Sequence, residues 1–512
     1  MKKKLVFILL LVFNISCTVR AQTFPKRELR AAWIATVANI DWPSRKGLTT
    51  QEQKAEYVRI LDTLKQVGMN AVIVQVRPMA DAFYPSTYEP WSEYLTGTQG
   101  LPPQPYYNPL AFMIEQARQR GLEFHAWFNP YRAGTVEKSV LDANHPINKN
   151  PEWFLQYGGK WYYDPGHPDA QAYVLDAIME TVKHYDLDAV HFDDYFYPYR
   201  IANVEFPDSC SYFEYGMGFE NKDDWRRNNV NTFVEALSVR IKKEKPHVKF
   251  GISPFGVWRN RDKDDDGSNT QAGQTNYDDL FADVVLWLKE GWIDYVTPQL
   301  YWHIGFDKAD YSILAKWWAN HSYGKHVYIG QGIYRIGQNG WKNPDEIVNQ
   351  VKLNRAYANV NGSMYFSAKY FLNNTENINE KMREIYPYPA LIPKMDWIDG
   401  AEPPPPISVT AKGTQGNGIE ISWQDSVNSG SSYYAIYRFD EISKPDFNNP
   451  QNLKAIVQRK PNTTQYWMDI TSRKRSRYSY AVTAIDRLHF ESDPSSFVYI
   501  QTRAKNKRIK LL

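Results

Sequence analysis

The feature that most constrains the fold is a regular alternation of short apolar runs with amphipathic stretches, from Leu29 to about Phe371. The runs have the length and the continuous apolar character of strands that are buried on both faces. They are LRAAWIATV, AVIVQVR, LEFHAWFNP, AVHFDDYFYP, VKFGISPFG, YVTPQLYW, HVYIGQGIY and SMYFSAKYF. Strands separated by helices form parallel sheets, so the pattern predicts an α/β fold, a (β/α)8 TIM-type barrel over residues 25–390. An open doubly wound sheet is the alternative, but no Gly-rich phosphate turn follows the first run.

Two of the intervening stretches predict helices from their own residues. TTQEQKAEYVRILDTLKQVG opens on Thr49, a suitable N-cap, and repeats apolar residues at spacings of three and four. PLAFMIEQARQRG has the same periodicity and ends on Gly121.

The character of the sequence changes at DGAEPPPPISVT, where a proline run predicts a stiff linker over residues 391–406. The segments GIEISW, YYAIYRF, RYSYAVTAID and SFVYIQT then alternate as strands do, which predicts an all-β sandwich over residues 407–503. Trp423, the IYR motif and YSYAVTAID from Tyr478 resemble a fibronectin type III module, including the Tyr of a tyrosine corner. Residues 504–512 are expected to be a basic tail.

The first 21 residues predict an export signal. MKKK supplies positive charge, LVFILLLVFNI an apolar segment too short to span a membrane, and Ala21 a small residue for cleavage. The alternative is a lipoprotein signal that ends before Cys17, which would then carry a lipid anchor. Both interpretations predict an exported protein, periplasmic or associated with the outer membrane. Cys210 is then the only thiol expected in the mature chain, so no intramolecular disulfide is expected.

The charge balance and the aromatic content indicate which kinds of molecule the protein is expected to bind. The chain has 60 basic and 57 acidic residues and no basic block outside KNKRIK, which argues against nucleic acid as the main partner. It also has 17 Trp and 36 Tyr, many of them beside Pro, Asn or Gly in expected loops. Large cores could use these rings; a surface that stacks on sugar rings could use them as well. The C-terminal module is expected to have a protein or glycan partner of its own.

Polar side chains follow the predicted strands at their C-terminal ends, where the loops of such barrels build active sites. The fourth strand ends in two adjacent carboxylates, Asp193 and Asp194, which are predicted to be catalytic together with Tyr301. The residues predicted to bind substrate around them are Arg77, Asp81, His125, Trp127, Asn129, Trp258, Gln299 and Trp302.

Other chemistries have less support. His125, His191 and His303 come from three strands without HxH or HExxH spacing. The acidic stretch Asp262–Gly267 imitates the start of a calcium loop, but Gly273 stands where that loop needs Glu. No GxSxG elbow or Cys–His pairing appears. We therefore expect no metal and no cofactor, and carboxylates in an aromatic bowl point to glycoside cleavage.

Several longer runs carry a family resemblance. ELRAAWIATVANIDWPS, GMNAVIVQVRPMADAFYPS, YNPLAFMIEQARQRGLEFHAWFNPYR, HFDDYFYP, GISPFGVWRN and WIDYVTPQLYW resemble the glycosyl hydrolase-like ten family of exported bacterial barrel proteins. The resemblance covers roughly residues 25–387 and implies a (β/α)8 glycoside hydrolase. A characterised enterobacterial member, a divisome-localised glycosyl hydrolase, acts on peptidoglycan strands stripped of their peptides, so the resemblance also implies that substrate. The C-terminal module is not part of it.

The adjacent aspartates allow more than one mechanism. Neighbouring strand residues normally face opposite ways, so one of the pair could work while the other has a structural partner. At a strand end both can lean into the bowl, where repulsion raises one pKa and keeps that residue protonated. Retaining and inverting schemes need two carboxylates about 5–9.5 Å apart across the scissile bond. Adjacent residues seldom reach the longer separation, so Asp81 or Asp41 would then supply the second carboxylate.

Substrate assistance is the alternative, in which the 2-acetamido group of an N-acetylhexosamine acts as the nucleophile. Asp193 would then polarise the amide, Asp194 would protonate the leaving oxygen, and Tyr301 would hydrogen-bond the acetamido carbonyl. The leading function is thus hydrolysis of an envelope glycan that contains N-acetylhexosamine. A non-catalytic glycan-binding protein and a scaffold whose module recruits a protein partner are the competing hypotheses.

Overall fold

The computed structural model describes residues 24–135, 141–338, 340–414, 418–426, 429–440, 445–502 and 510–511. The predicted export signal, Cys17 and most of the basic tail lie outside these residues. Within the described ranges, no helix has both the length and the apolar character needed to cross a bilayer.

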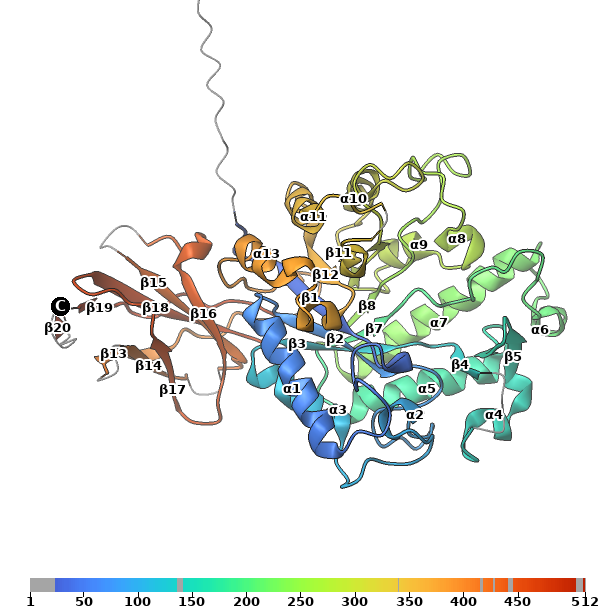
Figure 1. The fold of residues 1–512 in the computed structure, drawn as a ribbon, viewed down its shortest axis with the longest axis horizontal. Coiled ribbons are helices and arrows are strands. Elements are labelled where there is room, and N and C mark those ends of the chain that lie inside the picture. Colours follow the sequence, from blue (N-terminus) through green and yellow to red (C-terminus); the bar gives the residue numbers. More distant parts are fainter. Residues whose placement is uncertain are drawn as a thin grey trace, which may run out of the picture.

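The N-terminal part is a closed parallel barrel, as the sequence predicts (Figure 1). Its strands are β1 (Leu29–Ile34), β2 (Ala71–Arg77), β3 (Glu123–Phe128), β7 (Ala189–Phe192), β8 (Lys249–Ile252), β9 (Tyr295–Val296), β10 (Gln299–Leu300), β11 (His326–Gln331) and β12 (Val360–Tyr365). β9 and β10 are two pieces of one barrel strand, since β11 pairs with both of them. The sheet closes because β11 also pairs with β12 and β12 with β1.

Alternation along each strand separates two cores. On β1, Ala32 and Ile34 belong to the cluster that faces the surrounding helices, whereas Ala31 and Trp33 belong to the cluster inside the barrel. Both faces of the strand are therefore buried, which explains the continuous apolar runs.

Helices cover the barrel on its outside. They are α1 (Thr50–Gln66), α3 (Pro109–Gln119), α5 (Pro168–His184), α7 (Lys222–Glu244), α9 (Val284–Lys289), α10 (Tyr311–Asn320), α11 (Glu346–Asn354), α12 (Ala368–Leu372) and α13 (Ile378–Ile385). The predicted cap of α1 is present as a capping box: the Thr49 side chain accepts a hydrogen bond from the Glu52 amide, and the Glu52 carboxylate accepts one from the Thr49 amide.

The loops at the C-terminal ends of the strands carry short additional elements. They are α2 (Glu93–Thr96), α4 (Pro146–Lys149), α6 (Ser209–Tyr215), α8 (Asn276–Asp279) and a small antiparallel sheet of β4 (Arg132–Thr135), β5 (Phe154–Tyr157) and β6 (Lys160–Tyr163). This sheet follows β3 directly, so it brings Arg132 next to the end of the barrel.

The C-terminal part consists of two antiparallel sheets. One has β13 (Ile407–Gly413), β14 (Ile419–Gln424) and β17 (Thr464–Asp469). The other has β15 (Tyr433–Phe439), β16 (Leu453–Gln458), β18 (Arg477–Ile485), β19 (Val498–Gln501) and β20 (Lys510–Leu511). Trp423, Tyr434 and Tyr480 belong to one buried cluster contributed by both sheets. The all-β prediction is confirmed, while the resemblance to fibronectin type III remains a prediction.

The predicted linker is not free of the barrel. Ile392, Met395 and Ile398 are buried in the same cluster as Leu29 and Ala31 of β1. Residues 391–398 therefore pack against the N-terminal ends of the strands, and the C-terminal module lies at that end of the barrel (Figure 1).

Candidate active site

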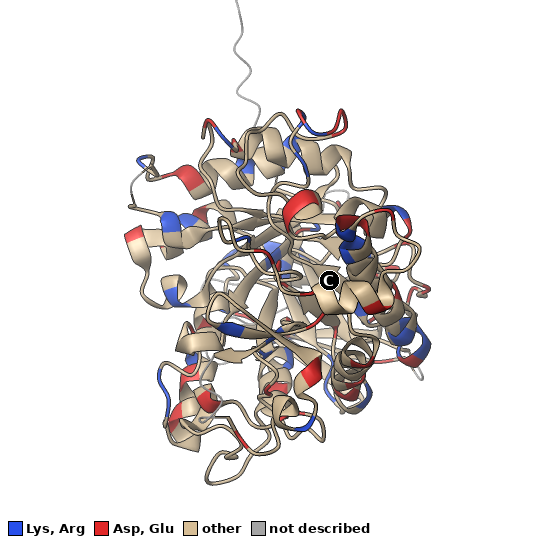
Figure 2. Ribbon diagram, turned by 90° about the vertical axis from the view of Figure 1, so that its right-hand side faces the viewer, with Lys and Arg blue, Asp and Glu red and all other residues tan. Residues whose placement is uncertain are grey.

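A cavity of about 380 Å³ opens at the C-terminal ends of the barrel strands. Figure 2 looks onto this end of the molecule, where basic and acidic positions are interspersed. The cavity is lined by Trp33, Val37, Ile40, Gln75, Trp127, Arg132, Asp193, Asp194, Tyr195, Ser253, Gln299, Tyr301, Tyr334, Phe366, Ser367, Lys369 and Tyr370. Among these described residues, Asp193 and Asp194 are the only carboxylates. The structure thus brings together five of the predicted site residues: Trp127, Asp193, Asp194, Gln299 and Tyr301.

Asp193 is surrounded by N–H donors. The indole Nε1 of Trp127 donates to its Oδ2 at 3.0 Å, and the Asn129 amide donates to both carboxylate oxygens at 3.1 and 3.2 Å. The Tyr195 backbone amide donates to Oδ1 at 3.3 Å. Donors that cannot accept favour the ionised carboxylate and fix its plane.

Asp194 has a different set of partners. The Tyr199 hydroxyl hydrogen-bonds its Oδ2, and the Gln299 side-chain amide donates to its Oδ1 at 3.2 Å. The same Gln299 amide donates to the Ser253 carbonyl at 2.9 Å, which holds it in place. A hydroxyl can donate or accept, so the surroundings of Asp194 accommodate a protonated carboxyl as well as a carboxylate.

Burial raises the pKa of both acids. The pKa of Asp193 rises to about 6 because the side chain is buried and because Asp194 lies beside it, while Arg132 and the Asn129 and Trp127 donors act in the opposite direction. Burial likewise raises the pKa of Asp194, against the Tyr199 and Gln299 hydrogen bonds. Two adjacent buried carboxylates therefore compete for one proton, which is the condition an acid and an ionised partner require.

Tyr301 and two cations complete the cavity wall. The Tyr301 ring packs edge-on against Tyr334, with centroids 5.7 Å apart, and burial raises its pKa well above the ordinary value, so the phenol stays neutral. The Arg132 guanidinium lies 3.4 Å from the centre of the Tyr195 ring, and its buried Nε has no hydrogen-bond partner. Among the described residues, no carboxylate forms an ion pair with Lys369.

The two other carboxylates proposed from the sequence have structural roles. Asp41 accepts from the Ala35 amide at 2.8 Å, the Ser367 hydroxyl at 2.7 Å and the Lys369 amide at 2.8 Å, so it ties the end of β1 to the end of β12. Asp81 accepts from the Met79 amide at 3.0 Å. Both are buried and neither lines the cavity.

Three predicted substrate-binding residues on β2, on β3 and directly after β3 do not line the cavity. Arg77 is fully buried, and its Nε donates to Glu89 at 2.6 Å, so its charge is used inside the protein. His125 lies inside the barrel, with its Nε2 3.1 Å from a Glu123 oxygen. Asn129 is buried behind Asp193 and acts on it through the hydrogen bonds described above.

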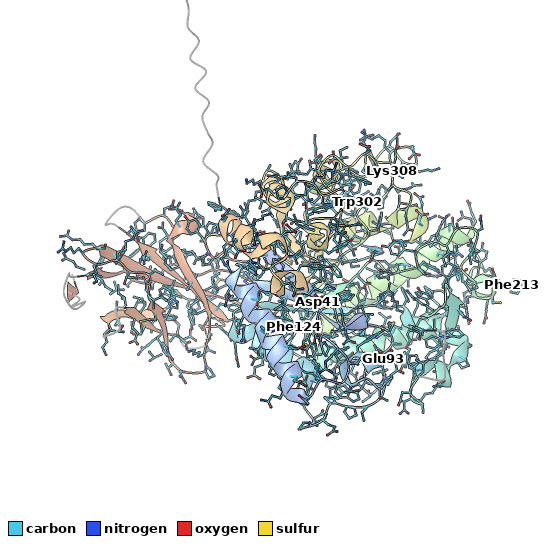
Figure 3. All side chains as sticks on the ribbon, viewed as in Figure 1. Asp41, Glu93, Phe124, Phe213, Trp302 and Lys308 are labelled. Atoms are coloured by element: carbon cyan, nitrogen blue, oxygen red, sulfur yellow. The ribbon has the colours of Figure 1, made fainter. Side chains whose placement is uncertain are left out.

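Two tryptophans that were predicted to stack on sugar pack against aromatic rings of the protein instead. Trp258 stacks on Trp317, with centroids 5.8 Å apart, and Trp302 packs edge-on against Phe255 at 5.5 Å. Neither lines the cavity. In the view of Figure 3, Trp302 lies at the level of α10 and Asp41 nearer the middle of the barrel.

Four residues of the site were not predicted from the sequence: Arg132, Tyr195, Tyr199 and Tyr334. Tyr195 and Tyr199 directly follow the aspartate pair in DDYFYPY, so their position was a usable signal. Arg132 reaches the cavity only because β4 folds back beside the barrel end, which no local pattern indicates.

Comparisons with known proteins agree with this geometry. The family profile described as Glycosyl hydrolase-like 10 matches residues 28–347. This chain belongs to that family. Among its relatives, Glycosyl hydrolase YngK of Bacillus subtilis (strain 168) is 49% identical over 503 residues, which are 96% of this chain and 97% of the relative. Glycosyl hydrolase DigH of Escherichia coli (strain K12) is 36% identical over 371 residues, 67% of this chain and 84% of the relative.

One solved structure matches a large part of this chain. The glycoside hydrolase domain of PgaB (BpsB) from Bordetella bronchiseptica matches 70% of this chain and 99% of its own length, with a TM-score of 0.46 and 13% sequence identity. Family membership and the two named relatives identify the chain as a glycoside hydrolase.

Proposed function

We propose that this glycoside hydrolase cleaves an envelope glycan that contains N-acetylhexosamine, with peptide-free peptidoglycan strands as its substrate. The observation that carries the proposal is the adjacent pair Asp193 and Asp194, in a cavity whose described lining holds no third carboxylate. Retaining and inverting mechanisms use two carboxylates about 5–9.5 Å apart on opposite sides of the scissile bond, so they would require another acidic residue in this cavity. Neighbouring carboxylates suit substrate assistance instead.

In this mechanism Asp193, ionised among its N–H donors, accepts a hydrogen bond from the acetamido N–H of the sugar. The acetamido carbonyl oxygen then attacks C1 while Asp194 gives its proton to the leaving oxygen, and the C1–O bond breaks. Tyr301, kept neutral by burial, donates a hydrogen bond to the acetamido oxygen and orients it. Water opens the cyclic intermediate as Asp194 takes a proton back, which restores both acids.

The cations of the cavity favour a glycan that bears a carboxylate. No carboxylate of the described residues lies within ion-pair distance of Lys369, and the Arg132 Nε has no hydrogen-bond acceptor. Half-buried cationic groups that line a cavity favour an anionic ligand, which can accept their free N–H groups. The lactyl ether of muramic acid supplies such a carboxylate only when the stem peptide has been removed.

The test is digestion of three matched substrates: peptide-free strands, intact sacculi, and peptide-free strands whose lactyl carboxylates have been amidated. We expect cleavage of the first, identified by product mass, and at least about 10-fold slower cleavage of the other two, because each lacks the free charge. Equal rates on all three would contradict the assignment of the carboxylate. Binding without products from any of them, in wild type and Asp194→Asn alike, would favour the alternative of a glycan-binding protein.

Export to the periplasm or the outer membrane, with Cys17 as a candidate lipid anchor, belongs to the same proposal, because that is where the substrate lies.

A further inference from the structure

The C-terminal module inserts one turn into the N-terminal mouth of the barrel. Leu488 is buried in the barrel's interior cluster together with Leu29 and Ala31. Arg487 donates to Asp186 at 2.9 Å at the edge of this contact, where both side chains are partly exposed. The residue after Leu488, His489, is 6% exposed, and its ring stacks on Tyr433 of the module with centroids 6.0 Å apart. The module is thus docked by apolar, ionic and hydrogen-bonded contacts.

His489 meets a buried carboxylate of the barrel. Its Nε2 lies 2.6 Å from Oε1 of Glu123, the first residue of β3, which is 2% exposed. The Lys249 ammonium pairs with the same oxygen, and His125 Nε2 lies 3.1 Å from the other. Burial opposes ionisation of Glu123, but Lys249 and His489 hold its pKa well below the ordinary value. Glu123 is therefore an ionised acceptor served by three donors.

From Glu123 an unbroken chain of hydrogen bonds runs through the barrel. His125 Nδ1 lies 2.8 Å from the Tyr295 hydroxyl, and His191 Nδ1 lies 2.9 Å from the same hydroxyl. At its far end His191 Nε2 lies 3.3 Å from the Trp33 indole Nε1 and 3.1 Å from the Ser253 hydroxyl. Trp33 and Ser253 line the catalytic cavity.

The Trp33 indole at one end and the Glu123 carboxylate at the other determine the protons on the two histidines and Tyr295 between them. An indole N–H can only donate, so Nε2 of His191 is an acceptor and its Nδ1 carries the proton. That proton goes to the Tyr295 oxygen, the Tyr295 hydroxyl donates to His125 Nδ1, and His125 Nε2–H donates to Glu123. Burial lowers the pKa of His191 well below the ordinary value, so this ring is neutral, as the chain requires.

The chain also reaches the catalytic carboxylates. His191 stands two residues before Asp193 on β7, and the Ser253 carbonyl holds the Gln299 amide that donates to Asp194. The orientation of His191 therefore bears on the backbone that leads to Asp193 and, through Ser253, on the residue that holds Gln299.

We propose that His489, contributed by the C-terminal module, is a positioning residue of the active site: through Glu123, His125 and Tyr295 it fixes His191, two residues before Asp193, and Ser253, whose carbonyl holds the Gln299 amide that donates to Asp194. The module is then a part of the hydrolase rather than a spacer. Measuring activity rests on the proposed function. The experiment therefore also includes an NMR measurement that does not depend on the proposed function.

The experiment compares His489→Ala, His489→Gln and Arg487→Ala in the full chain. Gln places an N–H near the position of Nε2, whereas Arg487→Ala weakens docking at the same turn without touching Glu123. With ¹⁵N-labelled histidine, ten residues in the whole sequence, NMR reads the tautomers of His191 and His125. Steady-state kinetics on peptide-free strands give kcat and KM separately.

We expect His489→Ala to shift the His191 signals and to lower kcat about 10-fold with KM nearly unchanged, because the reacting groups would move by less than the roughly 1 Å that costs about 100-fold. His489→Gln should restore both readouts, and Arg487→Ala should change neither. If His489→Ala does not fold, Tyr295→Phe breaks the chain without disturbing docking and should give the same shift and loss. The double variant His489→Ala/Tyr295→Phe should have a kcat no lower than that of either single variant, because both break the same hydrogen-bond chain.

Unchanged His191 signals in folded His489→Ala or Tyr295→Phe would overturn the proposal, as would an equal loss of kcat in Arg487→Ala. If the wild-type protein cleaves no glycan, only the proposed function is refuted, because the histidine tautomers would still report on the hydrogen-bond chain.

Discussion

At the scale of single residues, partner chemistry distinguishes two carboxylates that the sequence presents as equals. Asp193 is held by the N–H groups of Trp127, Asn129 and Tyr195, which can only donate. Asp194 is held partly by a hydroxyl, which can take either role. On this difference in partners we base the proposal that Asp193 is the ionised, polarising residue and Asp194 the proton donor.

The assignment predicts that the two variants differ in their sensitivity to the leaving group. Asp194→Asn should slow substrates with poor leaving groups by about 10²–10⁴-fold and spare an activated aryl glycoside, which needs no proton. Asp193→Asn should slow both alike, because nucleophilic attack is impaired in each. A thiazoline analogue of the cyclised intermediate should inhibit the wild type, since it resembles the state that the site stabilises. Full activity on glycans without acetamido groups would contradict substrate assistance.

The raised pKa of Asp193 predicts the acid limb of the pH profile. As the pH falls through about 6, Asp193 takes up a proton and can no longer accept from the acetamido N–H, so kcat/KM should fall about 10-fold per pH unit below that value. Asn129→Leu removes donors that lower this pKa, so its acid limb should move to higher pH. If Asp193 were the general acid, activity would instead fall as the pH rises above 6.

At the scale of elements, buried ion pairs hold the loops at the strand ends in place. In the sequence alone, their charged residues look like substrate-binding residues. Arg77 ends β2, bonds Glu89 in the following loop and donates to the Asn129 carbonyl after β3. Its guanidinium and the Glu89 carboxylate are almost fully buried. The pair therefore connects two strand ends.

Arg77→Met should lower the free energy of unfolding by about 3–5 kcal/mol, because it leaves the buried Glu89 charge without its partner. Lys46→Met is the matched control: it breaks an ion pair with Glu93 that is partly exposed on both sides, and should change stability by less than about 1 kcal/mol. Chemical denaturation measures both. A raised KM with unchanged stability would return Arg77 to the substrate-binding residues.

At the scale of the whole molecule, barrel and module share one buried boundary. Leu391 lies in a cluster with Tyr433 and Ile485 of the module, and Leu488 of the module lies among barrel residues. The Arg27 guanidinium donates to the His489 carbonyl at 3.0 Å. Apolar surface from both parts is removed from water, so neither part is expected to unfold alone.

Calorimetry of the full chain should therefore show one cooperative transition. A chain ending at Ala401 should melt at a lower temperature and bind an apolar dye, because residues of the barrel mouth become exposed. If the module were only a spacer, this shorter chain would keep the stability and activity of the full one. Two separate transitions in the full chain would likewise contradict a shared boundary.

Much of the barrel could be predicted because its determinants are local. Every predicted apolar run corresponds to a barrel strand, since strands buried on both faces need continuous apolar residues. The same reasoning located the aspartate pair, because parallel strands direct their C-terminal ends to one face. It could not separate Arg77 from Gln299, since both are polar residues at strand ends.

The sequence by itself determined the order of strands and helices and the strand that carries the carboxylates, since those follow from periodicity along the chain. Only the tertiary structure decided which polar side chains face the cavity and which are paired behind it. Those outcomes depend on partners far apart in sequence: Asn129 reaches Asp193 across 64 residues, and Glu123 meets His489 across 366. A buried charge or amide is stable only with a partner, and that partner is known only once the chain has folded.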